Sequence, residues 1–137
     1  MKKPFSMMMQ AVVPVLLITM LLTSAAPQKE EVMTKEDGMF VVNTTTLGKD
    51  VVGYLDTTPL KIYIKKDKVV KIEALKNQET PKYFAKVKRE LLNLWDGKKV
   101  SEAATMKVDA VTGATFSSEA VVKNVQLGLE YYRQHKK

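Results

Sequence analysis

An alternation of apolar and polar residues between positions 60 and 74 constrains the fold most strongly. Apolar side chains stand at every second position of residues 60–64 and again of residues 70–74. Successive side chains of a strand point to opposite faces, so a period of two predicts strands with one buried and one solvated face. Residues 65–68, KKDK, separate the two runs, and the segment therefore predicts an antiparallel hairpin. Its buried positions are predicted to be Leu60, Ile62 and Ile64, then Val70, Ile72 and Ala74.

Two further runs with strand-forming composition precede the hairpin. Residues 39–47 and 50–55 are rich in β-branched and aromatic side chains, and glycines at positions 48 and 53 interrupt them. Such side chains pack well on a pleated surface, so this composition is typical of strands. We therefore expect two short strands joined by a turn.

A helix with recognisable ends is predicted after the hairpin. Thr80 is placed to be its N-cap, and Pro81 stands at the first helical position, where the missing N–H costs nothing. Gly97 follows the last apolar residue and marks the end. Spacings of three and four predict one buried face, made of Phe84, Val87, Leu91 and Leu94. Trp95, beside this face, is expected in the core.

The C-terminal part of the chain predicts a linker and a second long helix. Residues 100–107 are the expected linker, and the helix is expected from about Ser117 to about Gln134. Its apolar stripe consists of Val121, Val125, Leu129 and Tyr132. Strands followed by helices predict an α+β fold: a small single domain in which two main helices pack on a curved antiparallel sheet.

The N-terminal residues have the pattern of an export signal. Lys2 and Lys3 precede an apolar run at residues 11–22, and small residues at 23–26 provide a cleavage site. The run is short for a membrane span, and Pro14 within it suits a signal better than a stable helix. Residues 1–25 are therefore predicted to be a signal peptide, and a retained N-terminal anchor is the alternative.

The remaining chain divides into a leader and a domain. Residues 26–38 are polar and mixed in charge, so we expect a flexible leader without fixed structure. Residues 39–137 are the expected domain. An export signal predicts that this domain works in the periplasm or on the outer face of the cytoplasmic membrane.

Composition excludes several kinds of chemistry. The chain has no cysteine, which rules out disulfides, thiolate-bound zinc, iron–sulfur clusters and a thiol nucleophile. Its single histidine, His135, lies near the C-terminus, where a frayed end is expected rather than a metal ligand or general base. The formal net charge is +7, but the lysines alternate with apolar positions as on a solvated face. Neither a metal site nor a nucleic-acid partner is predicted.

Residues 108–122, VDAVTGATFSSEAVV, place a turn of small and hydroxyl-bearing residues directly before an apolar helical pattern. Unpaired backbone N–H groups and the positive end of the dipole meet at a helix start, and such a place binds anions, above all phosphate. Gly113 and Ala114 let a ligand approach the backbone. The hydroxyls able to donate to phosphate oxygens are those of Thr112, Thr115, Ser117 and Ser118. On physical grounds alone, a phosphate site and a plain helix cap formed by Ser117 or Ser118 fit equally well.

Residues 109–115, DAVTGAT, match the pattern Asp, two variable residues, Ser or Thr, Gly, Ala, Thr. By this motif the chain resembles FMN-binding domains, which occur in the exported flavin-bearing subunits of sodium-pumping NADH:quinone reductases and Rnf-type complexes and in related free-standing flavoproteins. The resemblance covers roughly residues 50–130, including GYL at 53–55 and ETP at 79–81. In that family a flavin transferase uses FAD to attach FMN through a phosphoester to the last Thr of the motif.

For this chain, the resemblance implies FMN as the cofactor and Thr115 as its attachment point. The residues of the recognition signal are then Asp109, Thr112, Gly113 and Ala114. Those expected to hold the phosphate, with nearby backbone amides, are Ser117 and Ser118. Those expected around the flavin ring are Glu79, Thr80 and Tyr54.

Three functions remain open, and we favour an exported electron-transfer flavoprotein that carries covalently linked FMN and has no catalytic residue of its own. A chain without cysteine and with one terminal histidine has no side chain that cycles easily between redox states, so a bound cofactor must do so. Its expected partners are the flavin transferase, a membrane or exported redox protein, and the membrane surface.

The other two functions are a flavin-dependent reductase of a small extracellular acceptor and a secreted binding or structural module without cofactor. The reductase would need a substrate pocket beside the ring, and the sequence offers no conspicuous acid–base pair for it. In the binding module, DAVTGAT would be a turn and nothing more.

Overall fold

An antiparallel hairpin forms one half of the sheet in the computed structural model, which describes residues 31–137. Strands β3 (Leu60–Lys65) and β4 (Lys68–Ala74) pair around a turn made by Lys66 and Asp67. Both turn residues have positive φ, 51° and 59°, which matches the twist of the two strands. The predicted hairpin is confirmed, and the three predicted core residues of β3 are fully buried.

A β-bulge changes which residues of β4 face the core. The register shifts between Tyr63 and Ile64, which pair with Lys71 and Val69, so Val70 is the extra residue. Val69 is buried, whereas Val70 is 41% exposed. The prediction that Val70 faces the core is wrong, because an alternating sequence does not show where an extra residue interrupts the ladder.

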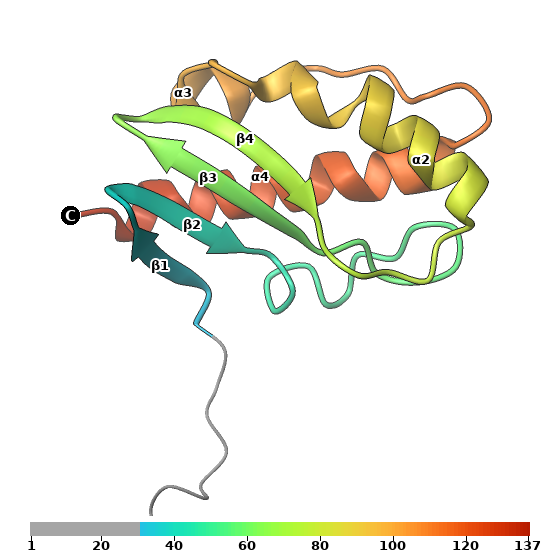
Figure 1. Ribbon diagram of the computed structural model, residues 1–137, viewed down its shortest axis with the longest axis horizontal. Helices are drawn as coiled ribbons and strands as arrows, with labels where there is room; N and C mark the ends of the chain where they lie inside the picture. The colour runs from blue at the N-terminus through green and yellow to red at the C-terminus, as the bar shows by residue number, and fades with distance from the viewer. Residues whose placement is uncertain (1–30) are drawn as a thin grey trace, which may run out of the picture. The chain divides into compact units, whose positions relative to one another are not determined.

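Two more strands complete the sheet. Strands β1 (Met33–Glu36) and β2 (Met39–Asn43) extend it in the antiparallel order β1-β2-β3-β4 (Figure 1). The prediction of a strand from residue 39 is confirmed by β2, but residues 26–38 were expected to lack fixed structure and β1 lies among them. That expectation is wrong for β1 because an edge strand is held by backbone hydrogen bonds to one neighbour and needs no apolar alternation.

The second predicted strand, residues 50–55, is a loop. One isolated bridge, between Val52 and Thr57, closes it, and the large side chains of Val52, Tyr54 and Leu55 are more than half exposed. The strand prediction is wrong here because the backbone N–H groups of Tyr54 and Leu55 bind a glutamate side chain instead of a neighbouring strand.

Helix α2 (Pro81–Glu90) begins as predicted, with Thr80 at the N-cap position and Pro81 at the first helical position. It ends earlier than predicted, and the chain continues as the 3-10 helix η1 (Leu92–Trp95). Three residues per turn replace the 3.6 of an α-helix, which rotates the later side chains. Trp95 is buried as predicted, but Leu94 is 43% exposed and its predicted place on the buried face is wrong.

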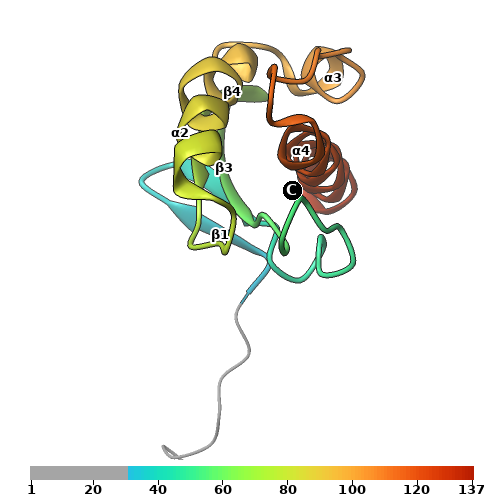
Figure 2. The same cartoon turned by 90° about the vertical axis from the view of Figure 1, so that its right-hand side faces the viewer.

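The C-terminal segment contains two helices. Short helix α3 (Val100–Ala103) lies in the segment predicted to be a linker, and helix α4 (Thr115–His135) begins slightly before the predicted start. The four predicted stripe residues of α4 are all buried. Helix α4 packs along β2 and β3, and its position beside the sheet is seen end-on in Figure 2. Within residues 31–137, none of the helices combines the length and the apolar character that crossing a bilayer requires.

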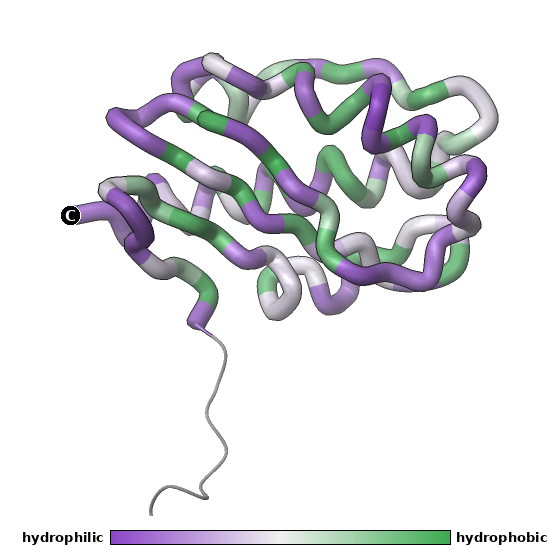
Figure 3. Tube along the Cα trace, viewed as in Figure 1, coloured by the Kyte–Doolittle hydropathy of each residue, from purple (hydrophilic) through white to green (hydrophobic). Residues whose placement is uncertain are grey.

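One hydrophobic core joins the sheet and the helices. The inward side chains of β2, β3 and β4 pack with those of α2, η1, α3 and α4 in a single buried cluster. Along the strands, apolar and polar residues alternate in Figure 3 as this one-sided burial requires. The structure is thus a small α+β domain with an open antiparallel sheet, as predicted. The proposed signal peptide, residues 1–25, lies outside the described residues.

The last turn of α4 is tied to the β3–β4 turn through Asp67. The Tyr132 hydroxyl donates a hydrogen bond to Asp67 Oδ1 at 2.6 Å, and Lys136 Nζ lies 3.0 Å from the same oxygen. These two hydrogen bonds, that of Tyr132 first, hold the pKa of Asp67 below its ordinary 3.8. Burial and then the bond to Asp67 raise the pKa of Tyr132 to about 12.

Leu91→Ala and Leu94→Ala test whether α2 gives way to η1 or continues as one helix with both leucines on its buried face. Leu91→Ala should lower the free energy of unfolding by about 2–5 kcal/mol, because it leaves a cavity in the core. Leu94→Ala should lower it by less than about 1 kcal/mol, because that side chain is largely solvated. Urea unfolding followed by Trp95 fluorescence compares the two variants. Equal losses would contradict the transition from α2 to η1.

Asp67→Asn should destabilise the domain at neutral pH but not in strong acid. A lowered folded-state pKa means that the carboxylate contributes stability that is fully present above about pH 3.8 and is lost as the pH falls through the lowered value. Asn tolerates the positive φ of this position and keeps an oxygen that can accept from Tyr132. Unfolding of both proteins at neutral pH and at about pH 2 measures the difference. A stability difference that is the same at both pH values would refute this role of Asp67.

Candidate functional site

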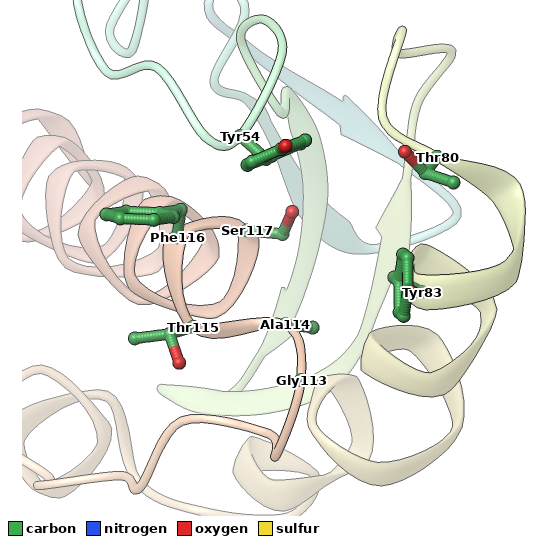
Figure 4. A pocket seen from close by; sticks show the side chains of 8 residues that line it. All are labelled: Tyr54, Thr80, Tyr83, Gly113, Ala114, Thr115, Phe116 and Ser117. Atoms are coloured by element: carbon green, nitrogen blue, oxygen red, sulfur yellow. The ribbon is translucent and has the colours of Figure 1, made fainter.

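Three parts of the chain enclose a pocket at the start of α4, called the α4 pocket below. They are the loop at residues 51–58, the start of α2, and the turn that leads into α4 (Figure 4). The cavity has a volume of about 380 Å³, within the usual range for small-molecule sites. Its lining residues are Tyr54, Thr80, Tyr83, Gly113, Ala114, Thr115, Phe116 and Ser117.

The turn before α4 leaves the helix start without a side-chain cap. Gly113 has φ +82°, a conformation that would strain any residue with a side chain. Ala114 is the N-cap residue and provides no oxygen for the first N–H groups of the helix. The interpretation of Ser117 or Ser118 as a plain N-cap is wrong, because both lie inside the first turn of α4. Among the residues that the structure describes, the first N–H groups of the helix therefore have no partner, and they lie at the positive end of its dipole.

Thr115 is the first residue of α4. Its side chain is exposed, borders the α4 pocket, and its hydroxyl makes no hydrogen bond to the residues that the structure describes. Asp109 and Thr112 are also exposed but do not line the pocket. The motif therefore has one accessible hydroxyl at the pocket, and two polar residues on the outer surface of the same turn.

The two serines of the first turn have different positions. Ser117 lines the pocket, and its Oγ donates to Glu79 Oε1 at 3.0 Å. Ser118 is fully buried: its Oγ donates to the Ala114 carbonyl at 2.7 Å and accepts from the Val111 N–H at 3.0 Å. Ser118 therefore holds the turn in shape and is not presented to a ligand, contrary to the role expected from the sequence.

Glu79 connects two walls of the pocket from behind. Its carboxylate is buried and accepts from the backbone N–H groups of Tyr54 and Leu55, each at 2.7 Å, as well as from Ser117. A Cβ atom on Gly53 would collide with this carboxylate, so only glycine lets the loop backbone pass so close. This set of contacts, called the Glu79 bridge, positions the loop against α4. Glu79 itself does not line the pocket, whereas Thr80 and Tyr54 do.

Aromatic side chains stand on both sides of the pocket. Tyr54 and Phe116 are stacked, with ring centroids 6.4 Å apart and planes 26° from parallel, and Tyr83 lies across from them on α2 (Figure 4). All three are about half exposed or more, which is unusual for such large apolar surfaces. Their faces suit a planar ring system.

Sequence reasoning missed Tyr83, Phe116 and Lys86. Phe116 falls off the apolar stripe of α4, so helical periodicity could have marked it as exposed. Lys86 donates to the Thr112 carbonyl at 3.1 Å and places a positive charge beside the turn. No local signal relates Lys86 to the motif, because α2 and the turn meet only through tertiary packing.

The site fits a phosphorylated aromatic ligand. An uncapped helix start with a neighbouring lysine favours an anionic group, and the aromatic walls favour a planar ring. Among residues 31–137, no group of three or more His, Asp or Glu side chains could hold a metal ion.

A sequence model of the FMN-binding domain family matches residues 53–130, which is more than half of the chain. The matched region begins at Gly53 of the Glu79 bridge, ends in α4, and includes every residue that lines the α4 pocket. No curated protein and no solved structure matches the chain. The chain therefore belongs to the FMN-binding domain family, and FMN is its cofactor.

Proposed function

We propose that this protein is an exported electron-transfer flavoprotein that carries FMN through a phosphoester on Thr115. The observation that supports this most strongly is the accessible Thr115 hydroxyl at the uncapped start of α4, beside a pocket with aromatic walls. A hydroxyl enclosed in the core would leave no room for a ribityl phosphate. FMN supplies the redox chemistry, and the chain binds and orients it.

Attachment requires a transferase and FAD. The Thr115 oxygen would form a bond to the phosphorus of the FMN half of FAD while the pyrophosphate bond breaks, AMP leaves and the hydroxyl proton is released. Asp109 and Thr112 are exposed outside the pocket, where a transferase could contact them while Thr115 reacts. These two residues, with Gly113 and Ala114, are the proposed recognition signal.

The phosphate diester would then lie beside the first backbone N–H groups of α4. Donors at a helix start and the positive end of the dipole stabilise such an anion, and Lys86 adds a charge nearby. Ser117 borders this position, although its hydroxyl proton is directed to Glu79. The flavin ring would occupy the cavity between Tyr54, Phe116 and Tyr83.

A covalent link has a physical advantage outside the cytoplasm. A cofactor that dissociates there is diluted without limit, whereas a tether keeps it at an effective concentration of about millimolar or more beside its pocket. The signal-like pattern of residues 1–25 supports export. The flavin transferase and a membrane or exported redox protein complete the proposed set of partners.

Thr115→Ala should abolish covalent flavin while leaving the domain folded. The chain is co-expressed with a flavin transferase, denatured, and tested for flavin fluorescence that migrates with the protein in a gel. Thr115→Ser should keep the signal because it keeps a hydroxyl, and Thr105→Ala, an exposed threonine in the loop before the motif, is the matched control. Fluorescence that persists in Thr115→Ala would rule out this attachment point.

Glu79→Ala should reduce both stability and flavin attachment. It removes the acceptor of three hydrogen bonds and should lower the free energy of unfolding by about 2–3 kcal/mol. Glu79→Gln should lose less stability and less flavin attachment, because its amide oxygen can still accept a hydrogen bond. Leu91→Ala is the control: it has a similar expected loss of stability, and Leu91 does not line the pocket. Attachment is measured at a temperature where all variants are folded. If Leu91→Ala loses as much attachment as Glu79→Ala, the Glu79 bridge has no specific role in it.

A further inference from the structure

The two ends of α4 have opposite surroundings. At 1.5 Å per residue its 21 residues span about 30 Å, from the α4 pocket to the C-terminus. At the far end the last turn of α4 meets the β3–β4 turn and the start of α3 (Figure 1). This end is hydrophilic in Figure 3, in the β3–β4 turn and at the C-terminus. We call it the cationic pole; its charged residues are Lys65, Lys66, Asp67, Lys68, Lys98, Lys99, Glu102, Glu130, Arg133, Lys136 and Lys137.

Tertiary contacts bring these charges together. Lys68 and Lys99 form an isolated β-bridge, and the Val100 N–H donates to the Asp67 carbonyl at 2.8 Å. Tyr132 of α4 and Lys136, the residue directly after this helix, both bind the Asp67 carboxylate. The surface between these elements is hollowed, with a volume of about 450 Å³. The cations that line this hollow are Lys66, Lys68, Lys99, Arg133 and Lys136.

The cationic pole has a large excess of positive charge. It has eight Lys and Arg residues against three carboxylates, and the β1–β2 turn beside it adds Lys35, Glu36 and Asp37. With these three residues this end has nine cations against five carboxylates, an excess of four positive charges. Three of the eight cations pair with carboxylates: Lys136 with Asp67, Lys98 with Glu102 and Arg133 with Glu130. The other five form no salt bridge to the residues that the structure describes.

The chemistry of the pole suits a lipid surface better than a protein. Protein interfaces are enriched in aromatic residues and depleted in lysine. The aromatic residues among the exposed large apolar side chains are Tyr54, Tyr83 and Phe116, and all three line the α4 pocket at the other end. An electron-transfer partner must also approach that pocket, because electron tunnelling falls off exponentially with distance. A dense group of lysines instead matches the charge of an anionic bilayer.

We propose that the cationic pole docks the domain on an anionic membrane surface, with the α4 pocket directed away from the bilayer. This inference goes beyond the proposed function and does not depend on flavin attachment. The attraction is electrostatic, so it is strong at low ionic strength and is lost when salt shortens the screening length to about 3 Å at 1 M.

Vesicle binding of the full chain tests the proposal. Cosedimentation is measured with vesicles of phosphatidylglycerol and with vesicles of phosphatidylcholine, at low and at high salt. The chain should prefer the anionic vesicles, and high salt should remove the preference. Residues 1–30 are common to all variants, so comparison between variants isolates the pole. A preference for anionic vesicles that high salt leaves unchanged would refute the proposal.

The decisive comparison uses two triple variants with the same loss of charge. Lys66→Gln with Lys99→Gln and Arg133→Gln removes three cations from the pole, and at about fivefold per cation should weaken binding to anionic vesicles roughly 100-fold. The control replaces three exposed lysines elsewhere, Lys76, Lys107 and Lys123, with Gln. Its binding to anionic vesicles should weaken far less.

Three outcomes are informative beyond this difference. Equal losses in the two triple variants would overturn the proposal, because they would reflect net charge alone. Displacement from vesicles by inorganic phosphate at constant ionic strength would also overturn it, because it would assign the pole to a small anion. Gel fluorescence of attached flavin should be unchanged in both triple variants. Failure of the membrane proposal can therefore be told apart from failure of the attachment at Thr115.

Discussion

The arrangement of the site depends on one buried carboxylate. A charge removed from water must be compensated by hydrogen bonds, and Glu79 finds its donors in the backbone of Tyr54 and Leu55 and in the hydroxyl of Ser117. If the loop moved away from α4, the buried carboxylate would lose some of these hydrogen bonds, so the two walls stay together. Gly53 makes this close approach sterically allowed. The shape of the α4 pocket therefore depends on the hydrogen bonds that the buried Glu79 carboxylate requires.

Helix α4 organises the rest of the molecule. Its buried stripe packs on the sheet, its uncapped start faces a pocket with aromatic walls, and its last turn meets the lysines of the β3–β4 turn. A helix dipole favours anions at the start and cations at the end, so both ends agree with the field of the helix. The domain therefore presents two chemically distinct surfaces, an aromatic one at the start of α4 and a cationic one at its end.

Much of the fold could be predicted because its signals are local. The hairpin alternation, the start of α2 and the stripe of α4 each reflect periodicity within one element, and the structure confirms them. The errors occur where another element decides the outcome. The bulge at Val70 depends on pairing with β3, strand β1 on the free edge of β2, and the exposure of Leu94 on a change of helix type that the residue pattern does not mark. The loop at residues 51–58 has strand-like composition, but a side chain takes the hydrogen bonds that a strand would have used.

By itself, the sequence determined that a small hydroxyl-rich turn leads into a helix near Ser117 and that the motif is that of FMN-binding domains, because these properties lie within a few consecutive residues. Only the tertiary structure decided which motif residues face the pocket, why Ser118 is turned inward, and how Glu79, 38 residues away from Ser117, comes to bind it. Tyr83 and Lys86 likewise reach the site only because α2 packs beside the turn. A binding pocket is made by distant segments that share a core, and no local pattern encodes the distances between them.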